Sequence, residues 1–507
     1  MESSDSSSHI AAKFRLPFVL FTVLSTLAVL VPVVMGYCGF PTPQGDEDAY
    51  LPPAVNLVQG KGLVNQVWGQ NYVIDPDHRR FIYHGFLEQF LLAKVLPQHR
   101  TSAQLPFVLA LMLATSLAFT AAAYPRLLRV CGEPNFTWTR CIAGLLGLGA
   151  TTALSLGLLA RPELLVLLFV AVFLFVYSFE PNRRTVTTLG GLIIGASAAT
   201  SPLSGIHVAM LYCLLLTWRT SYREASIQIF ITGLIAAATF FAIFYVVCPY
   251  SITEWIAGLR AHSRTAVGGV LLAFHLSTMF FNPQMPGLGL LLAAFFGCSA
   301  KLLWNLRKTW GAWYLGLPLA IIFLASVSLN VALHSFKVYN LIPIMPVFVG
   351  IVAAVMFRGG RIVRCSLLAT LALPTLGIVR QVLLFIVYLQ SGMRLSEAQA
   401  RFEELAIDDS TLTGMSGNMM FLMDDYDQRR VIRTDRPQYP TNDWPVEWIV
   451  LGQSGSGHLE PAEYPGFELV ADYYRRTPPR LLSIRLGNTT PGYAFAAYRR
   501  IRSAALE

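Results

Sequence analysis

Charged residues are scarce in this sequence. Of its 507 residues, 13% are charged and 54% are apolar, and the mean hydropathy is +0.52. Soluble proteins carry about 25% charged residues. The composition therefore excludes an ordinary soluble domain and predicts an α-helical polytopic membrane protein, in which lipid solvates most of the surface.

Patterns typical of metal binding and disulfides are also missing. The seven cysteines show no Cys-x-x-Cys and no cysteine–histidine spacing of a zinc site, and none follows Cys365. We therefore expect neither a structural disulfide nor a zinc site. The net charge of +9 does not indicate nucleic-acid binding, because the basic residues stand in short clusters between apolar runs, a pattern that orients membrane helices.

The apolar runs predict about eleven spans within a transmembrane domain at 16–390. The serine-rich segment 1–15 precedes the first run, and we expect it to be disordered. No small-residue cleavage signal follows that run, which predicts an uncleaved first helix. The expected spans are 16–36, 103–124, 140–160, 162–179, 186–201, 203–218, 226–248, 286–304, 310–331, 340–357 and 366–389.

The distribution of lysine and arginine predicts the orientation. If the N-terminus is cytoplasmic, every cytoplasmic connection is basic, whereas the short turns on the other side hold few cations. The extracytoplasmic side then holds a first loop at 37–102, a second at 249–286 and a tail at 391–507. The tail is more polar, and we expect a small soluble α/β domain there. Its expected elements are a helix at Ser396–Leu405 and strands at Asn418–Leu422, Trp448–Leu451, Phe467–Ala471, Leu482–Leu486 and Tyr493–Tyr498.

Three consecutive acids, Asp46, Glu47 and Asp48, follow the first span. They introduce a stretch in which Tyr50 and later apolar residues recur at helical spacing, up to a stop at Gly60. A carboxylate here could act as a general base, and a neighbouring acid could raise its pKa or help to hold a divalent cation. The alternative is that these acids are only solvated.

Two further motifs stand at the same membrane face. In Arg161-Pro162-Glu163, proline and glutamate suit a helix start, but an arginine there could also bind a phosphate. Lys337 and Tyr339 lie between two spans and could contact a lipid phosphate or only anchor the helix ends. Weaker candidates are His84 with Glu88, His207, Arg260, His262, Arg264 and His275.

Together these motifs resemble the GT-C glycosyltransferase superfamily, in particular the branch around the protein O-mannosyltransferases and the bacterial lipid A aminoarabinose transferase. That branch has an acid pair after the first span, then a tyrosine and a glycine, then an Arg-Pro-Glu/Asp motif, and later a basic residue followed by tyrosine and proline. The matching residues are Asp46, Glu47, Tyr50, Gly60, Arg161, Pro162, Glu163, Lys337, Tyr339 and Pro343.

The resemblance implies transfer of a sugar from a polyprenyl-phosphate donor to a lipid, glycan or protein acceptor, with inversion. It implies that Asp46 is the general base and Glu47 its partner, with Glu163 supporting the acids or the acceptor. Arg161, Lys337 and Tyr339 would bind the donor phosphate. Tyr50, His84, Arg260, His262 and His275 are possible substrate contacts. A divalent cation held by Asp46, Glu47 and Asp48 is a possible cofactor, although a single base suffices chemically.

Two departures from the family pattern concern donor binding. The first loop has Phe81-Ile82-Tyr83-His84-Gly85-Phe86 where the family commonly has a Pro-Pro step, and Thr200-Ser201-Pro202 stands where a basic residue is often found. No lectin-like domain is present, which favours a bacterial-type enzyme of the plasma (inner) membrane. The alternatives are a transporter or flippase-like protein, and an inactive GT-C-like scaffold.

Overall fold

Helices predominate in the computed structural model of the chain. The structure describes residues 5–41, 47–65, 81–82, 84–96, 101–130, 135–157, 159, 161–217, 222–265, 290, 293–294, 297–298, 301, 342–343, 345–346, 360–391, 393–408, 411–422, 430–433, 446–453, 461, 463–476, 480–481, 484–485 and 492–501. The helices within them include α1 (Asp5–Tyr37), α2 (Glu47–Val58), α3 (Leu87–Val95), α4 (Thr101–Val130), α5 (Trp138–Leu156), α6 (Glu163–Tyr177), α7 (Arg183–Thr200), α8 (Pro202–Thr217), α9 (Tyr222–Val247), α10 (Ile252–Thr265), α15 (Arg361–Ser391) and α16 (Leu395–Glu403).

Five helices in the described part of the chain are long and apolar enough to cross a membrane, which is consistent with a membrane protein. Their apolar segments are Leu16–Tyr37, Gln104–Arg129, Trp138–Leu156, Arg223–Val247 and Arg361–Gln390. Helices α6 and α8 are apolar but shorter. The sequence predicts a span near each of these helices and near α7, whereas the expected spans 286–304, 310–331 and 340–357 fall mostly outside the described residues.

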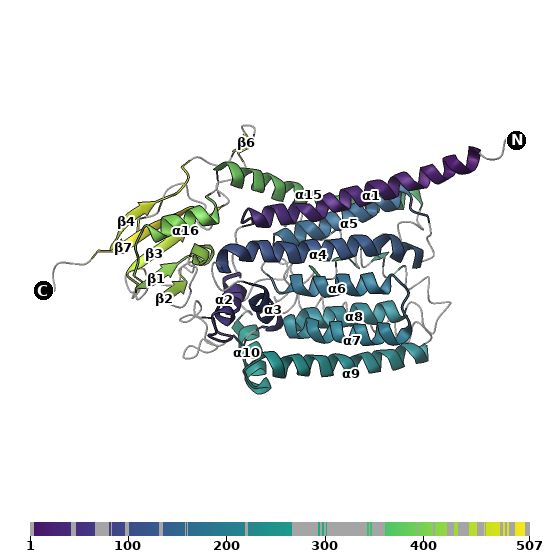
Figure 1. Cartoon of the computed structure of the whole chain (residues 1–507), viewed down its shortest axis with the longest axis horizontal. Helices are drawn as coiled ribbons and strands as arrows, with labels where there is room; N and C mark the ends of the chain where they lie inside the picture. Colours follow the sequence, from purple (N-terminus) through teal and green to yellow (C-terminus); the bar gives the residue numbers. More distant parts are fainter. Residues whose placement is uncertain are drawn as a thin grey trace.

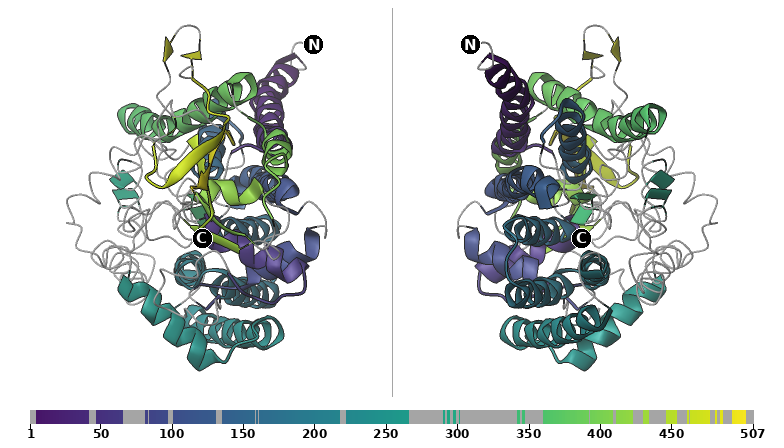
Figure 2. Two further views of the ribbon diagram at one scale, coloured as in Figure 1. Left: turned by 90° about the vertical axis from the view of Figure 1, so that its left-hand side faces the viewer. Right: turned by 90° about the vertical axis from the view of Figure 1, so that its right-hand side faces the viewer.

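The long helices run side by side in a bundle, with α1, α5 and α15 toward one edge and α9 at the other (Figures 1 and 2). Helix α4 packs on α1 and α6, and α7 packs on α6, α8 and α9. Small residues allow the close approach of α7 to α9: a Cβ at Gly195 would lie 2.5 Å from the backbone oxygen of Ala236. Such close backbone packing is typical of helices in membranes.

Three short helices, α2, α3 and α10, lie at one end of this bundle (Figure 1). The expected helix beginning near Tyr50 is confirmed as α2, and all its side chains from Tyr50 to Asn56 are buried. Helix α10 belongs to the expected second loop, and it buries Trp255 and Gly258 on one face, while most of the other side chains described in it are exposed. The apolar face of α10 therefore covers this end of the bundle.

A mixed five-stranded sheet lies at the same end as α2, α3 and α10 (Figure 1). Its strand order is β2-β1-β3-β7-β4, with β1 parallel to β2 and β3, and with β7 antiparallel to β3 and β4. A separate pair, β5 and β6, is antiparallel. The strands are β1 (Leu412–Met415), β2 (Arg430–Arg433), β3 (Trp448–Gly452), β4 (Phe467–Asp472), β5 (Arg480–Leu481), β6 (Ile484–Arg485) and β7 (Phe495–Arg500).

The tail prediction is confirmed for α16, β3 and β4, and β7 begins two residues later than expected. The strand expected at Asn418–Leu422 is wrong, because this segment lies in the 3₁₀ helix η4 (Gly417–Leu422), which packs on α16. The Phe421 oxygen accepts a hydrogen bond of 3.0 Å from Gln399, which satisfies a backbone group without a neighbouring strand. Within the strand expected at Leu482–Leu486, the structure describes Ile484 and Arg485, and both belong to β6.

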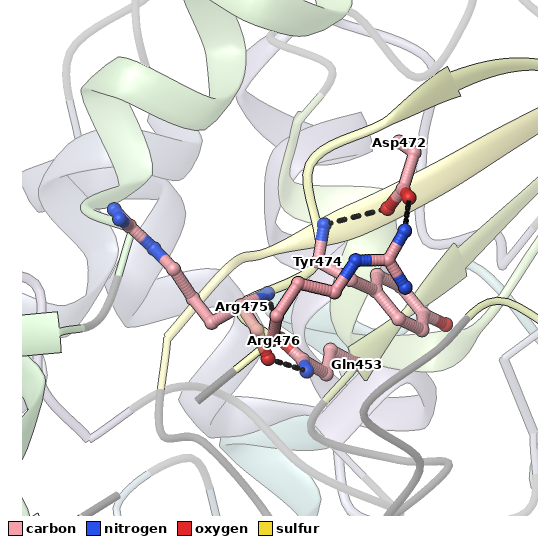
Figure 3. Close-up of polar contacts among 5 residues, drawn as sticks. All are labelled: Gln453, Asp472, Tyr474, Arg475 and Arg476. Carbon is pink, nitrogen blue, oxygen red and sulfur yellow. Dashed lines mark hydrogen bonds and ion pairs between the residues drawn. The ribbon is translucent and has the colours of Figure 1, made fainter. Parts of the chain in front are cut away.

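A buried glutamine holds the chain that leaves β4. The Gln453 side chain accepts a hydrogen bond from the Arg475 N–H and donates one to the Arg475 oxygen, each 2.8 Å long. Asp472 pairs with Arg476 and accepts from the Tyr474 N–H at 3.0 Å, while the Arg475 side chain points away from this group (Figure 3). Polar side chains thus replace the strand ladder where β4 ends.

Candidate functional site

A buried polar cluster lies where α2, α3, α6 and the α7–α8 junction meet. We use this name for Tyr50, His84, Glu88, Gln89, Arg161, Glu163 and Ser201, of which all but the half-buried His84 are buried. Three of its members, Glu88, Arg161 and Glu163, are charged residue types that are at most 3% exposed. Because isolated buried charges are costly, such a cluster is a candidate functional site wherever it occurs.

The segment before α3 is held against the end of α7. The Phe86 N–H donates to the Ala199 oxygen at 2.9 Å, and a Cβ at Gly85 would lie 2.1 Å from the Thr200 oxygen. Only glycine permits this approach of two backbones. The contact places His84 and Glu88 on either side of the crossing, so the local sequence His-Gly-Phe-Leu-Glu positions both side chains.

Tyr50 connects the first loop to the rest of the cluster. Its hydroxyl and His84 Nε2 share a hydrogen bond of 2.7 Å, and its ring lies under the Arg161 guanidinium at 4.6 Å. The Tyr50 backbone oxygen accepts a longer hydrogen bond, 3.4 Å, from Gln89. Since Tyr50 is in the first turn of α2, these contacts tie the start of α2 to Arg161.

Arg161 and Glu163 form a buried ion pair at the start of α6. Arg161 Nε lies 3.5 Å from Glu163 Oε2, and Glu163 Oε1 accepts a hydrogen bond of 3.2 Å from the Ser201 hydroxyl. Pro162 has a helical φ of −59° and needs no hydrogen-bond acceptor for its nitrogen, so it suits the position before α6. Glu163 also lies in the first turn, where the helix dipole favours a negative charge.

Glu88 brings a second carboxyl group to this ion pair. It lies in the first turn of α3 and is 1% exposed. Burial raises the pKa of Glu88 well above its usual range, the charge of Glu163 raises it further, and Arg161 lowers it in part. The neighbouring Gln89 is fully buried and donates to Glu88 Oε2 at 3.5 Å.

Aromatic residues pack against the segment that carries His84 and Glu88. Phe86, Phe244 and Trp255 pack edge to face with ring centroids 5.4 to 6.1 Å apart. The Trp255 Nε1–H donates to the His84 backbone oxygen at 2.9 Å, which attaches α10 to the segment before α3. A low local dielectric follows from this packing, and it strengthens each electrostatic interaction inside.

The predicted site residues are only partly described. Arg161, Glu163, Tyr50 and His84 lie in the cluster, whereas Arg260 is exposed on α10. Glu47, Asp48 and His262 belong to helices, but the structure does not describe their side chains. Asp46, His275, Lys337 and Tyr339 lie outside the described residues.

Three polar members of the cluster had no assigned role in the sequence interpretation or only a weak one: Glu88, Gln89 and Ser201. The adjacent residues Glu88 and Gln89 stand within an apolar run, and this pattern could have indicated a buried polar cluster, because polar residues inside such a run must find partners. Nothing local distinguishes Ser201, since a serine between two helices is common.

The cluster offers one guanidinium, two carboxyl groups, an imidazole and a phenol within a shielded volume. These groups can bind an anion, exchange protons or orient a hydroxyl group. No group of three or more potential metal ligands occurs among the described residues. Comparisons with protein-family models, with curated proteins and with solved structures find no match to this chain.

Proposed function

We propose that the chain is a GT-C-type glycosyltransferase that moves a sugar from a polyprenyl-phosphate donor to an acceptor at the membrane surface. One observation carries the proposal: Tyr50, His84 and the Arg161–Glu163 pair, which come from three separate sequence motifs, lie in one cluster at one end of an apolar helical bundle. A lipid-linked donor requires a polar site of this kind, because its tail stays in the bilayer while its phosphate stands at the interface.

The proposal includes the full membrane topology. About eleven spans cross the bilayer of a bacterial plasma membrane, and the N-terminus is cytoplasmic. The loops 37–102 and 249–286 and the α/β tail 391–507 are then extracytoplasmic. The support is the lysine and arginine pattern, together with the common position of α2, α3, α10 and the sheet at one end of the bundle.

Arg161 is the proposed contact for the donor phosphate, together with Lys337 and Tyr339. Breaking the bond between the sugar and the phosphate leaves charge on the phosphate, and a cation that is already in place stabilises it. The ion pair with Glu163 and the contact with the Tyr50 ring restrict the guanidinium before substrate binds. Such preorganisation lowers the entropic cost of reaching the transition state.

Asp46 is the proposed general base, with Glu47 as its partner. It directly precedes α2, whose first turn is linked through Tyr50 to Arg161 and His84. A base and a cation that act on opposite sides of the sugar permit direct displacement with inversion, in which the base removes the proton of the attacking acceptor.

The test compares Asp46→Asn with Asp48→Asn, a matched change at the acid outside the family pattern. Both purified variants are assayed for sugar transfer from polyprenyl-phosphate donors in lipid vesicles. We expect Asp46→Asn to lose about 10²- to 10⁴-fold in rate and Asp48→Asn to retain it. Equal rates for Asp46→Asn and wild type would refute the base. A wild-type protein that transfers no sugar but moves a solute across the vesicle would refute the function.

A further inference from the structure

Glu88 is a buried acid that has no cation of its own. It is 1% exposed, and among the described residues its Oε1 accepts no hydrogen bond. Its other oxygen, Oε2, accepts an interaction of 3.5 Å from Gln89, which is at the limit for a hydrogen bond. An ionised carboxylate in such a place would carry a large desolvation cost.

The described charges that face Glu88 do not balance if both Glu88 and Glu163 are ionised. The start of α6 presents Arg161 and Glu163, and these two already pair with each other. The segment before α3 presents His84, whose Nε2 shares a hydrogen bond with the Tyr50 hydroxyl of α2. On the neighbouring α10, Arg260 is exposed.

Two neutral side chains also donate hydrogen bonds in this region, and the cation of α3 is turned to a ring of its own helix. Ser201 at the α7–α8 junction donates to Glu163, and Trp255 of α10 donates to the His84 oxygen. Lys94 of α3 itself stands in the last turn of that helix, where it lies 5.3 Å from the Phe90 ring. Among the described residues of this region, one buried guanidinium therefore faces two buried carboxyl groups.

Several buried oxygens around Glu88 also accept no hydrogen bond from the described residues. In the described part of the chain, no hydrogen bond reaches the buried oxygens Glu88 Oε1, Gln89 Oε1 and Glu163 Oε2. A proton on Glu88 supplies one donor and removes one negative charge at the same time. Both changes lower the cost of burying the cluster.

We propose that Glu88 is a neutral carboxylic acid in the folded protein and a positioning residue that keeps a second negative charge away from the Arg161–Glu163 ion pair. If the proposed sugar transfer holds, the neutral Glu88 also avoids repelling the donor phosphate near Arg161. The tests of the protonation state use no activity assay. Their failure is therefore distinct from a failure of the proposed function.

The pH dependence of stability follows from the raised pKa of Glu88. The folded protein holds a proton that the unfolded chain releases near pH 4.3, so this group lowers the stability progressively as pH rises above that value, up to its folded pKa. Glutamine resembles the neutral acid in shape and does not titrate. We therefore expect Glu88→Gln to fold, to match or exceed wild-type stability near pH 8, and to decline less with rising pH.

The experiment uses wild type, Glu88→Gln and Glu403→Gln, the last being an exposed control in α16. For each protein, the apparent free energy of unfolding is measured as a function of pH, and an infrared spectrum is recorded. We expect wild type and Glu403→Gln to show the C=O band of a protonated carboxyl group at neutral pH, and Glu88→Gln to lack that band. An unchanged band in Glu88→Gln would overturn the proposal. So would a Glu88→Gln variant that is less stable than wild type near pH 8 or fails to fold.

Discussion

The substitution Arg161→Gln tests the electrostatics of the cluster, because it leaves Glu163 buried without its cation. Both side chains of this pair are at most 4% exposed, so solvent does not screen the loss. Removing one partner of a buried ion pair costs about 3–5 kcal/mol. In this variant, Glu163 can become neutral by taking up a proton. The free energy of that protonation sets an upper limit on the destabilisation, and the limit depends on pH.

The limit follows from the cost of protonating an ordinary glutamate. At pH 7 this cost is about 3.7 kcal/mol, because the reference pKa is about 4.3 and each unit corresponds to about 1.4 kcal/mol; at pH 5 it is about 1 kcal/mol. The destabilisation of Arg161→Gln is therefore expected to be about 3–4 kcal/mol at pH 7 and about 1 kcal/mol plus lost packing at pH 5. The double variant Arg161→Gln/Glu163→Gln should recover most of the loss at pH 7.

Arg183→Gln is the matched control for this experiment. Arg183 lies only 2.8 Å from Glu224, closer than Arg161 lies to Glu163, but the side chains are 63% and 44% exposed. Exposed pairs contribute about 0–1 kcal/mol, so we expect a small loss that does not vary with pH between 5 and 7. Denaturant titration at several pH values measures all four proteins. A loss for Arg161→Gln that is the same at pH 5 and pH 7 would refute the reasoning.

Two further predictions concern packing and the tail. Gly85→Ala should destabilise the protein by about 3 kcal/mol, because the added Cβ meets the Thr200 backbone. Gly233→Ala on α9 should raise stability by up to about 1 kcal/mol, because its Cβ would have nothing within 4 Å. Thermal unfolding compares the two variants, and equal stabilities would contradict the close contact at Gly85. Gln453→Leu should cost about 2–4 kcal/mol by leaving the Arg475 N–H and oxygen without hydrogen bonds. Hydrogen exchange should then rise in β3 and β4 but not in the bundle, and unchanged exchange in β4 would contradict this role.

Helices and several strands could be predicted because their signals are local. The recurrence of apolar residues after Tyr50 predicted α2, and β-rich runs near Trp448 and Phe467 predicted β3 and β4. The short strands β1 and β2 were missed, since Leu412–Met415 includes a glycine and is a strand only through its parallel partners. The apolar run in η4 fitted either a strand or a helix, and its packing on α16 decided between them.

The candidate site was predictable in its parts but not in its assembly. Arg161-Pro162-Glu163 is recognisable as a helix start with unusual charge, and His84 with Glu88 is recognisable as a polar pair in an apolar segment. Their meeting depends on the contact of Gly85 with the end of α7 and on the Tyr50 contact from α2. These contacts join segments far apart in the chain, and no local periodicity encodes them.

The amino-acid sequence by itself indicated that lipid surrounds the apolar helices, and it indicated the position of most helices. Both follow because hydropathy and helical period depend only on neighbouring residues. Only the tertiary structure decided that Glu88 faces the Arg161–Glu163 ion pair, because burial and the balance of charge depend on which segments pack together. The same carboxyl group would be an ordinary ionised acid on an exposed helix. Its surroundings, rather than its sequence neighbours, give it a raised pKa.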